Sequence, residues 1–136
     1  MKPELEEKLT KQFPLLYADV GADPTVSCMA FGFECNDGWY ELLHEVSSKL
    51  ELIIQKYIEE HDDCENYPRA AQVKEKFGSL SFYMTHYLDE FDDPIREAEA
   101  KSMITCEYCG KIGKIRVGGW MVTLCDGCDK KRDEER

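Results

Sequence analysis

The chain has 136 residues, 43 % of them hydrophobic, and a formal net charge of −11 at pH 7. That length suits one modest domain, or one domain with a small appended module. The sequence lacks an apolar run of about 18 residues and begins with polar residues, so it predicts neither a transmembrane span nor a signal peptide. Its seven cysteines, an odd number, disfavour a secreted disulfide framework and predict a reducing cytoplasm.

The charge is unevenly distributed along the chain. Residues 1–100 contain 22 acidic and nine basic residues, a net of −13, whereas residues 101–136 contain six and eight, a net of +2. Affinity for nucleic-acid phosphates depends on cationic side chains. The composition therefore disfavours a generic nucleic-acid binder.

Proline placement defines the first helix and the segment that follows it. Pro3 suits the first turn of a helix, and Pro14 ends that helix because the residue before a proline avoids the helical region. Residues 19–36 are rich in Gly, Pro and Asp, so we expect irregular or extended chain there. Within that segment, Phe31 and Phe33 are expected to point toward the core.

The longest predicted helix begins near Asn36 or Asp37, either of which suits a cap, and runs to about Glu60. Its apolar residues recur at spacings of three and four positions, which predicts one face buried in the core. These residues are Trp39, Leu42, Leu43, Val46, Leu50, Ile53, Ile54 and Tyr57.

Farther along, residues 72–77 and 80–84 alternate in polarity around Gly78-Ser79. Alternation with a turn-forming pair at its centre predicts a β-hairpin. A helix through residues 71–77 is the alternative. One more helix is predicted from about residue 95 to residue 103, with Asp93 as its cap.

The C-terminal part contains a cysteine motif that is more specific than any other feature of the chain. Cys106-x2-Cys109 and Cys125-x2-Cys128 are separated by fifteen residues, the spacing of a four-cysteine zinc site. Four thiolates fill a tetrahedral shell and leave no position for a reactive water, so one structural Zn²⁺ is predicted, and not a catalytic one. A metal-free reduced cluster or a disulfide pair is the alternative.

The residues between the two cysteine pairs predict the scaffold of this site. Residues 114–117 and 121–124 are expected to form two short strands joined at Gly118-Gly119, and a polar helix is expected from Asp129 to the end of the chain. This order of parts is typical of a treble-clef or zinc-ribbon-like finger: a cysteine pair, two strands, a second cysteine pair and a helix.

The predicted fold is therefore α+β and has two parts. Residues 1–103 form an acidic domain of helices plus one β-hairpin. Residues 104–136 form the four-cysteine zinc finger. We find no internal repeat and no flexible linker between them.

Three segments together resemble a group of small proteins encoded by bacteriophages, prophages and bacteria. They are FGFECNDGW (31–39), VKEKFGSLSFY (73–83) and CEYCG…GGWMVTLCDGC (106–128), and the resemblance covers most of the chain. It implies a phage or mobile-element protein that acts in the host bacterial cytoplasm and carries a C-terminal zinc finger. The zinc cysteines of the group match Cys106, Cys109, Cys125 and Cys128 here. The resemblance implies no reaction.

The sequence also lacks the motifs of common catalytic sites. It has no Gly-rich phosphate loop, no Gly-x-Ser-x-Gly and no His-Glu-x-x-His. Acidic pairs such as Asp62/Asp63 and Asp92/Asp93 suit Mg²⁺ in a nuclease, but no lysine-bearing nuclease motif accompanies them. We therefore predict a protein that is not an enzyme.

Two acidic tracts are the leading candidates for partner binding. They are either solvated loops or a surface that imitates the phosphates of nucleic acid, because duplex DNA carries one charge per about 1.7 Å of its axis. In the finger, Trp120 and Arg116 are further candidates, although Trp120 could instead cover the small core of the finger. The candidate residues of the tracts are Asp62, Asp63, Glu65, Asp89, Glu90, Asp92 and Asp93.

The favoured interpretation is a non-enzymatic phage or prophage protein that binds a host protein or nucleoprotein complex. An inhibitor of a bacterial defence complex, anti-CRISPR or otherwise, is the specific form of this hypothesis. The alternative is a nucleic-acid-binding or transcription-regulating zinc-finger module, although the charge makes direct nucleic-acid binding less favourable. No membrane partner is predicted, and a homodimer is left open.

Overall fold

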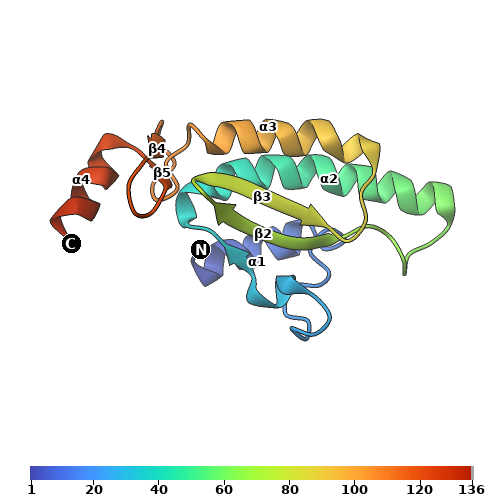
Figure 1. Cartoon of the computed structure of the whole chain (residues 1–136). Helices are drawn as coiled ribbons and strands as arrows, with labels where there is room; N and C mark the ends of the chain where they lie inside the picture. Colours follow the sequence, from blue (N-terminus) through green and yellow to red (C-terminus); the bar gives the residue numbers. More distant parts are fainter. Residues whose placement is uncertain (136) are drawn as a thin grey trace.

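The computed structural model describes residues 1–135, and Arg136 lies outside the described residues. The fold is mixed α/β, with helices against one small sheet and a second, two-stranded sheet toward the C-terminus (Figure 1). The helices are α1 (Pro3–Gln12), α2 (Tyr40–His61), α3 (Asp92–Ser102) and α4 (Asp126–Glu134). The strands are β1 (Phe33–Glu34), β2 (Ala70–Lys76), β3 (Ser79–Met84), β4 (Lys114–Arg116) and β5 (Val122–Leu124).

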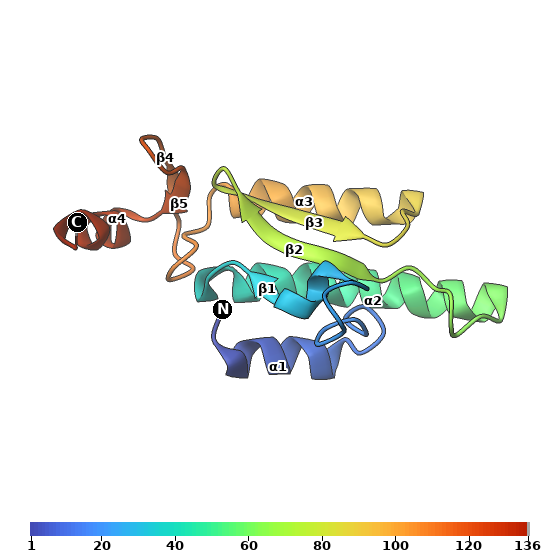
Figure 2. The ribbon, with the colours of Figure 1, turned by 60° about the horizontal axis from the view of Figure 1, so that its bottom comes forward.

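The larger sheet has the strand order β1-β2-β3, with β1 parallel to β2 and β2 antiparallel to β3. A parallel pair needs a long crossover, and α2 supplies it between β1 and β2. α2 and α3 lie side by side in opposite directions, and α1 lies along the other side of α2 (Figures 1 and 2).

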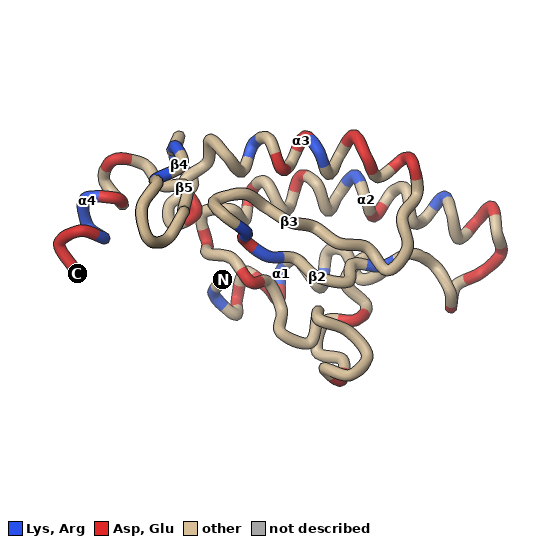
Figure 3. The backbone as a smooth tube through the Cα atoms, in the orientation of Figure 1, with Lys and Arg blue, Asp and Glu red and all other residues tan. Residues whose placement is uncertain are grey.

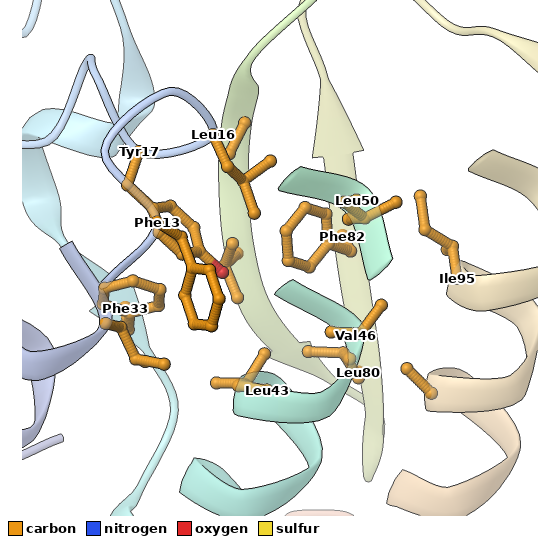
Figure 4. Close-up of a cluster of buried hydrophobic side chains, with 14 of the residues drawn as sticks. Phe13, Leu16, Tyr17, Phe33, Leu43, Val46, Leu50, Leu80, Phe82 and Ile95 are labelled. Atoms are coloured by element: carbon orange, nitrogen blue, oxygen red, sulfur yellow. The ribbon is translucent and has the colours of Figure 1, made fainter. Parts of the chain in front are cut away.

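We call residues 1–103, which contain α1–α3 and the larger sheet, the body; its core lies between the sheet and the helices. The predicted apolar face of the long helix is confirmed, because Leu43, Leu50 and Ile54 are fully buried. Figure 4 shows Leu80 and Phe82 of β3 among the buried side chains of α2. Residues 1–98 thus supply one continuous apolar cluster, and Cys106, Val122 and Leu124 form a separate small one.

One prediction for the segment before α2 was wrong. Phe31 is 66 % exposed, whereas Phe33 is buried as predicted. Gly32, with φ of 70°, turns the chain between them, so the two rings do not share a side. The rest of the expectation, irregular or extended chain, agrees with the structure, because the extended part includes β1, which pairs with β2 at Phe33 and Val73.

The predicted cap of the long helix was also wrong. A 3₁₀ turn, Asp37–Trp39, precedes α2, and neither polar side chain caps it. Asp37 instead accepts a hydrogen bond from the amide of Lys2 at 2.7 Å, and Asn36 bonds to the finger. Both side chains are used in long-range contacts that local spacing does not indicate.

The antiparallel strands β2 and β3 occupy the residues for which alternation predicts strands. The helix considered for residues 71–77 is wrong, because residues 70–76 are in β2. The connection consists of Phe77 and Gly78, since Ser79 already pairs with Lys76. Phe77 has φ of 54°, an unusual value for a residue other than glycine, and its ring is 70 % exposed.

α3 begins earlier than predicted. A 3₁₀ turn, Asp89–Phe91, leads directly into Asp92, so Asp93 lies inside the first turn and is not a cap. Phe91 is fully buried and fixes this start against the core. Acidic residues in the first turn suit the positive end of the helix dipole.

One buried carboxylate fixes the chain after α1, and its removal gives a testable result. Glu51 is 6 % exposed and accepts the amide hydrogens of Leu15 at 3.2 Å and Leu16 at 2.7 Å. We expect Glu51→Ala to destabilise the protein by about 2–5 kcal/mol, because one buried and one partly buried donor lose their acceptor. Urea unfolding monitored by circular dichroism measures this.

Glu51→Gln is the matched control for that variant. Its single amide oxygen can still accept one of the two hydrogens, so the expected loss is smaller. Equal unfolding midpoints for Glu51→Ala and the unsubstituted chain would show that this carboxylate does not hold the segment.

Candidate metal centre and acidic surface

The four cysteines of the predicted zinc motif come together. The Sγ atoms of Cys106, Cys109, Cys125 and Cys128 all lie within 4.8 Å of one another, and those of Cys109 and Cys125 are 3.6 Å apart. A Zn–S distance of about 2.3 Å places the sulfurs of a tetrahedral site roughly 3.8 Å apart. The four cysteines are therefore positioned to bind a metal ion, and four sulfur donors fit Zn²⁺.

Local backbone geometry brings each cysteine pair to the site. After Cys106 the chain turns tightly, with the Gly110 amide donating to the Cys106 carbonyl at 2.9 Å. Gly110 has φ of 83°, a conformation that favours glycine. In the second pair, Cys125 is the N-cap of α4, and its sulfur accepts a hydrogen bond from the Cys128 amide at 3.4 Å.

The surroundings of the second cysteine pair favour the thiolate form of one of its two cysteines. The hydrogen bond from the Cys128 amide lowers the pKa of Cys125 to about 7. The N-terminus of α4 also favours negative charge at this position. Burial, with hydrogen bonds from the other cysteines, raises the pKa of Cys128 to about 12. Metal binding must therefore displace the Cys128 proton, so low pH opposes it.

The two strands predicted between the cysteine pairs are present and pair antiparallel as β4 and β5. The final helix begins at Asp126 rather than Asp129, because the second cysteine pair forms its first turn. Its predicted last residue, Arg136, lies outside the described residues. Arg116 of β4 bonds to the Leu124 carbonyl at 2.9 Å and to Asp126 at 2.8 Å, which ties β4 to the start of α4.

The finger is attached to the body through buried polar contacts that the sequence did not predict. The Trp39 indole donates to the Thr105 carbonyl at 2.9 Å. The Gly38 amide donates to the Glu107 carbonyl at 2.8 Å. Thr123, fully buried, donates through its hydroxyl to the Gly78 carbonyl at 2.6 Å. The two apolar clusters are thus joined by hydrogen bonds and not by a shared core.

Glu107 is the main structural residue that sequence reasoning missed. It is 3 % exposed, and its Oε2 accepts from the amide and the side chain of Asn36 at 3.1 and 2.8 Å. Burial, the leading cause, raises the pKa of its carboxyl group. The sequence holds one indication of this contact. The Asn-Asp-Gly-Trp and Cys-Glu segments both belong to the stretches that carry the family resemblance, and they contact each other in this structure.

The two acidic tracts, distant in sequence, meet at one end of the body. Figure 3 shows acidic positions along the last turn of α2 and the loop after it, and along the start of α3, at the end opposite the finger. Glu60 and His61 from α2 line the same hollow, of about 330 Å³, as Leu88 and Glu90. We call this region, residues 59–65 with residues 89–93, the acidic end; it contains nine carboxylates.

The acidic end divides into carboxylates with internal partners and carboxylates without them. Asp63 accepts the amides of Glu65 and Asn66, and these hydrogen bonds, that of Asn66 first, lower its pKa. Asp92 pairs with Arg96 at 3.0 Å. Among residues 1–135, five predicted contact residues have no hydrogen bond or ion pair through their carboxylates: Asp62, Glu65, Asp89, Glu90 and Asp93.

The remaining two predicted contact residues lie at the other end of the molecule. Trp120 is 70 % exposed, so the alternative in which it covers the core of the finger is wrong. Arg116 has a side chain only 14 % exposed and pairs with Asp126 and Asp129. The predicted contact residues thus form two separate groups and not one surface.

Comparison with protein-family models, with curated proteins and with solved structures finds no match to this chain. None of the helices formed by residues 1–135 combines the length and the apolar character that crossing a bilayer requires. The site geometry is therefore the basis for assigning a function.

Proposed function

We propose that the cysteine cluster binds one structural Zn²⁺ and that the finger is of the treble-clef or zinc-ribbon type. Support comes from the order of its parts: a cysteine turn, the β4–β5 pair, and a second cysteine turn at the start of α4. Four thiolates leave no ligand position for substrate or water. The metal accordingly holds the finger and, through it, the contact with the body.

We propose further that the protein is a non-enzymatic phage or prophage protein that binds a host protein or nucleoprotein complex through the acidic end. The observation that carries this is the meeting of two acidic tracts at one end, with five carboxylates free of internal partners. Such a surface competes with nucleic acid for a basic cleft. Inhibition of a bacterial defence complex, CRISPR-based or other, is the proposed role in the host cytoplasm.

The alternative, a nucleic-acid-binding or transcription-regulating finger, has less support from the contacts. Arg116 and Arg132 both pair with Asp129 inside the finger and are mostly buried. Charges that are already paired contribute little to a phosphate contact. Lys111, Lys114, Lys130 and Lys131 remain exposed, but exposed lysines alone do not favour this function.

Neutralising the free carboxylates tests the acidic end. A variant with all five replaced by the matching amide is expected to lose at least about tenfold in binding to the host partner, because carboxylates in a basic cleft supply steering and contact energy. Binding to a partner captured from nuclease-treated host lysate is measured by interferometry at several salt concentrations. The substituted positions are Asp62, Glu65, Asp89, Glu90 and Asp93.

A control variant removes the same number of charges elsewhere. It is expected to bind with nearly the affinity of the unsubstituted protein and with a similar salt dependence. Capture that depends on nucleic acid, or equal weakening in both variants, would contradict the acidic end as the contact surface. Its substitutions to Gln are at Glu4, Glu41, Glu99, Glu134 and Glu135.

A further inference from the structure

Trp120 stands between two hollows at the end of the molecule opposite the acidic end. The first, of about 450 Å³, lies where the first cysteine turn meets β1 and β2. The second, of about 480 Å³, lies between the Phe77-Gly78 connection and the loop that joins β4 to β5. We call the pair the Trp120 groove. It belongs neither to the metal site nor to the acidic end.

The first hollow of the Trp120 groove is acidic. Glu34, Glu75 and Glu107 line it, together with the N-terminal ammonium group of Met1, which donates to the Cys35 carbonyl at 2.7 Å. Three carboxylates therefore face one cation. A cationic side chain from outside would balance the remaining charge.

Glu107 offers a ligand an acceptor oxygen held in a fixed position. Its side chain is nine-tenths or more buried, and both hydrogen bonds from Asn36 go to Oε2. Among residues 1–135, no group donates a hydrogen bond to Oε1, and Glu107 lines the hollow. Oε1 is accessible from the hollow, so a ligand with N–H donors can bond to it.

The second hollow is mainly apolar. Phe77 and Trp120 are each 70 % exposed, and Met121 also lines this hollow. Gly118 and Gly119 have no side chains, so a ligand can approach the backbone closely there. Lys76 is the basic residue that lines this hollow. Large apolar side chains exposed beside a hollow mark interaction sites.

We propose that the Trp120 groove binds an extended segment of a partner protein in which a Lys or Arg side chain stands next to an apolar side chain. The cation lies between the Glu75 and Glu107 carboxylates and the indole of Trp120, where charge and cation–π attraction act together. The apolar neighbour lies against Phe77 and Met121. This site does not depend on the function proposed for the acidic end.

A nucleic-acid base stacked on Trp120 is the competing occupant. Exposed tryptophans do stack on bases in single-strand binding proteins, but there the surrounding groove is basic. Here the carboxylates of the first hollow repel the phosphates that such a strand carries. The charge therefore favours a basic peptide.

The test is a selection of random decapeptides on the immobilised, zinc-loaded full-length protein. Enriched peptides are expected to carry Lys or Arg beside an apolar residue. Synthetic copies, and ten-nucleotide oligothymidylate, are then titrated while tryptophan emission is recorded. Trp39 is fully buried, so Trp120 is the reporter of binding.

Two variants decide the assignment. Trp120→Ala and Glu75→Gln are each expected to weaken peptide binding at least about tenfold, as for a central aromatic anchor and its charged neighbour. The Gly78 amide donates a hydrogen bond to the Glu75 carboxylate at 2.9 Å. Glu75→Gln keeps an oxygen that can accept this hydrogen bond, so the turn is preserved. Fluorescently labelled peptide measures binding to the tryptophan variant.

The five-site acidic-end variant is expected to bind the peptides as tightly as the unsubstituted protein, which separates the two sites. Enrichment of no peptide, enrichment without basic residues, or equal binding to Trp120→Ala would overturn the proposal. So would binding of oligothymidylate in preference to every selected peptide.

Discussion

Cys106→Ser is expected to abolish the retention of zinc and to unfold the finger. Structural zinc in such modules contributes apparent binding free energies of about 10–16 kcal/mol, and a hydroxyl replaces a thiolate poorly. The buried Trp39 indole donates a hydrogen bond to the Thr105 carbonyl, next to Cys106. Unfolding of the finger should expose this indole to water and shift the emission of Trp39 to longer wavelength. Zinc content by elemental analysis and tryptophan fluorescence measure the two effects.

Cys28→Ser is the matched control. Cys28 is an exposed free cysteine outside the cluster, so this variant should keep one zinc per chain and the emission of the unsubstituted protein. Retention of zinc by Cys106→Ser would show that the cluster is not the metal site. At falling pH the unsubstituted protein should release zinc to a chelator more easily, because protons compete for the thiolates.

Gly38→Ala is expected to separate the finger from the body and to destabilise the protein by about 3 kcal/mol or more. A Cβ atom at Gly38 would lie 2.2 Å from the Cys106 carbonyl oxygen and 2.6 Å from the Glu107 carbonyl carbon. Both are backbone atoms, so no side-chain rotation relieves the clash. Urea unfolding followed by circular dichroism gives the size of the loss.

Gly119→Ala provides the comparison. Nothing lies within 4 Å of a Cβ atom built there, and the backbone is not in the left-handed region, so stability should stay within about 0.5 kcal/mol. Equal unfolding midpoints for the two alanine variants would mean that the finger does not contact the body at Gly38.

The features that the sequence predicts well are those that depend on neighbours in the chain. The cysteine spacing brings each pair together within one turn, and the apolar spacing of α2 selects one buried face. Alternation around Gly78 gave the residues of β2 and β3, although the connection itself was placed one residue late.

The features it missed depend on residues far apart. Asn36 bonds to Glu107 across 71 positions, so the residue that looked like a helix cap serves the finger. β1 has only two residues and exists because α2 returns the chain to pair it with β2. Trp120 looked like a candidate for covering the finger, but Val122 and Leu124 already fill that small core.

The same distinction applies to the candidate surfaces. The acidic tracts were identified from composition, but only the antiparallel packing of α2 and α3 brings them to one end. The Trp120 groove has no local signal, because its walls come from the N-terminus, the β2–β3 connection and the finger. The acidic end depends on the packing of α2 and α3, whereas the Trp120 groove exists only if the finger is held in place.

X-ray absorption at the zinc edge of the purified full-length protein is the most direct test of that requirement. A site closed by Cys106, Cys109, Cys125 and Cys128 predicts four sulfur neighbours at about 2.3 Å and no lighter ligand. A shell containing nitrogen or oxygen, or protein without bound zinc, would contradict the metal centre on which the arrangement of the molecule depends.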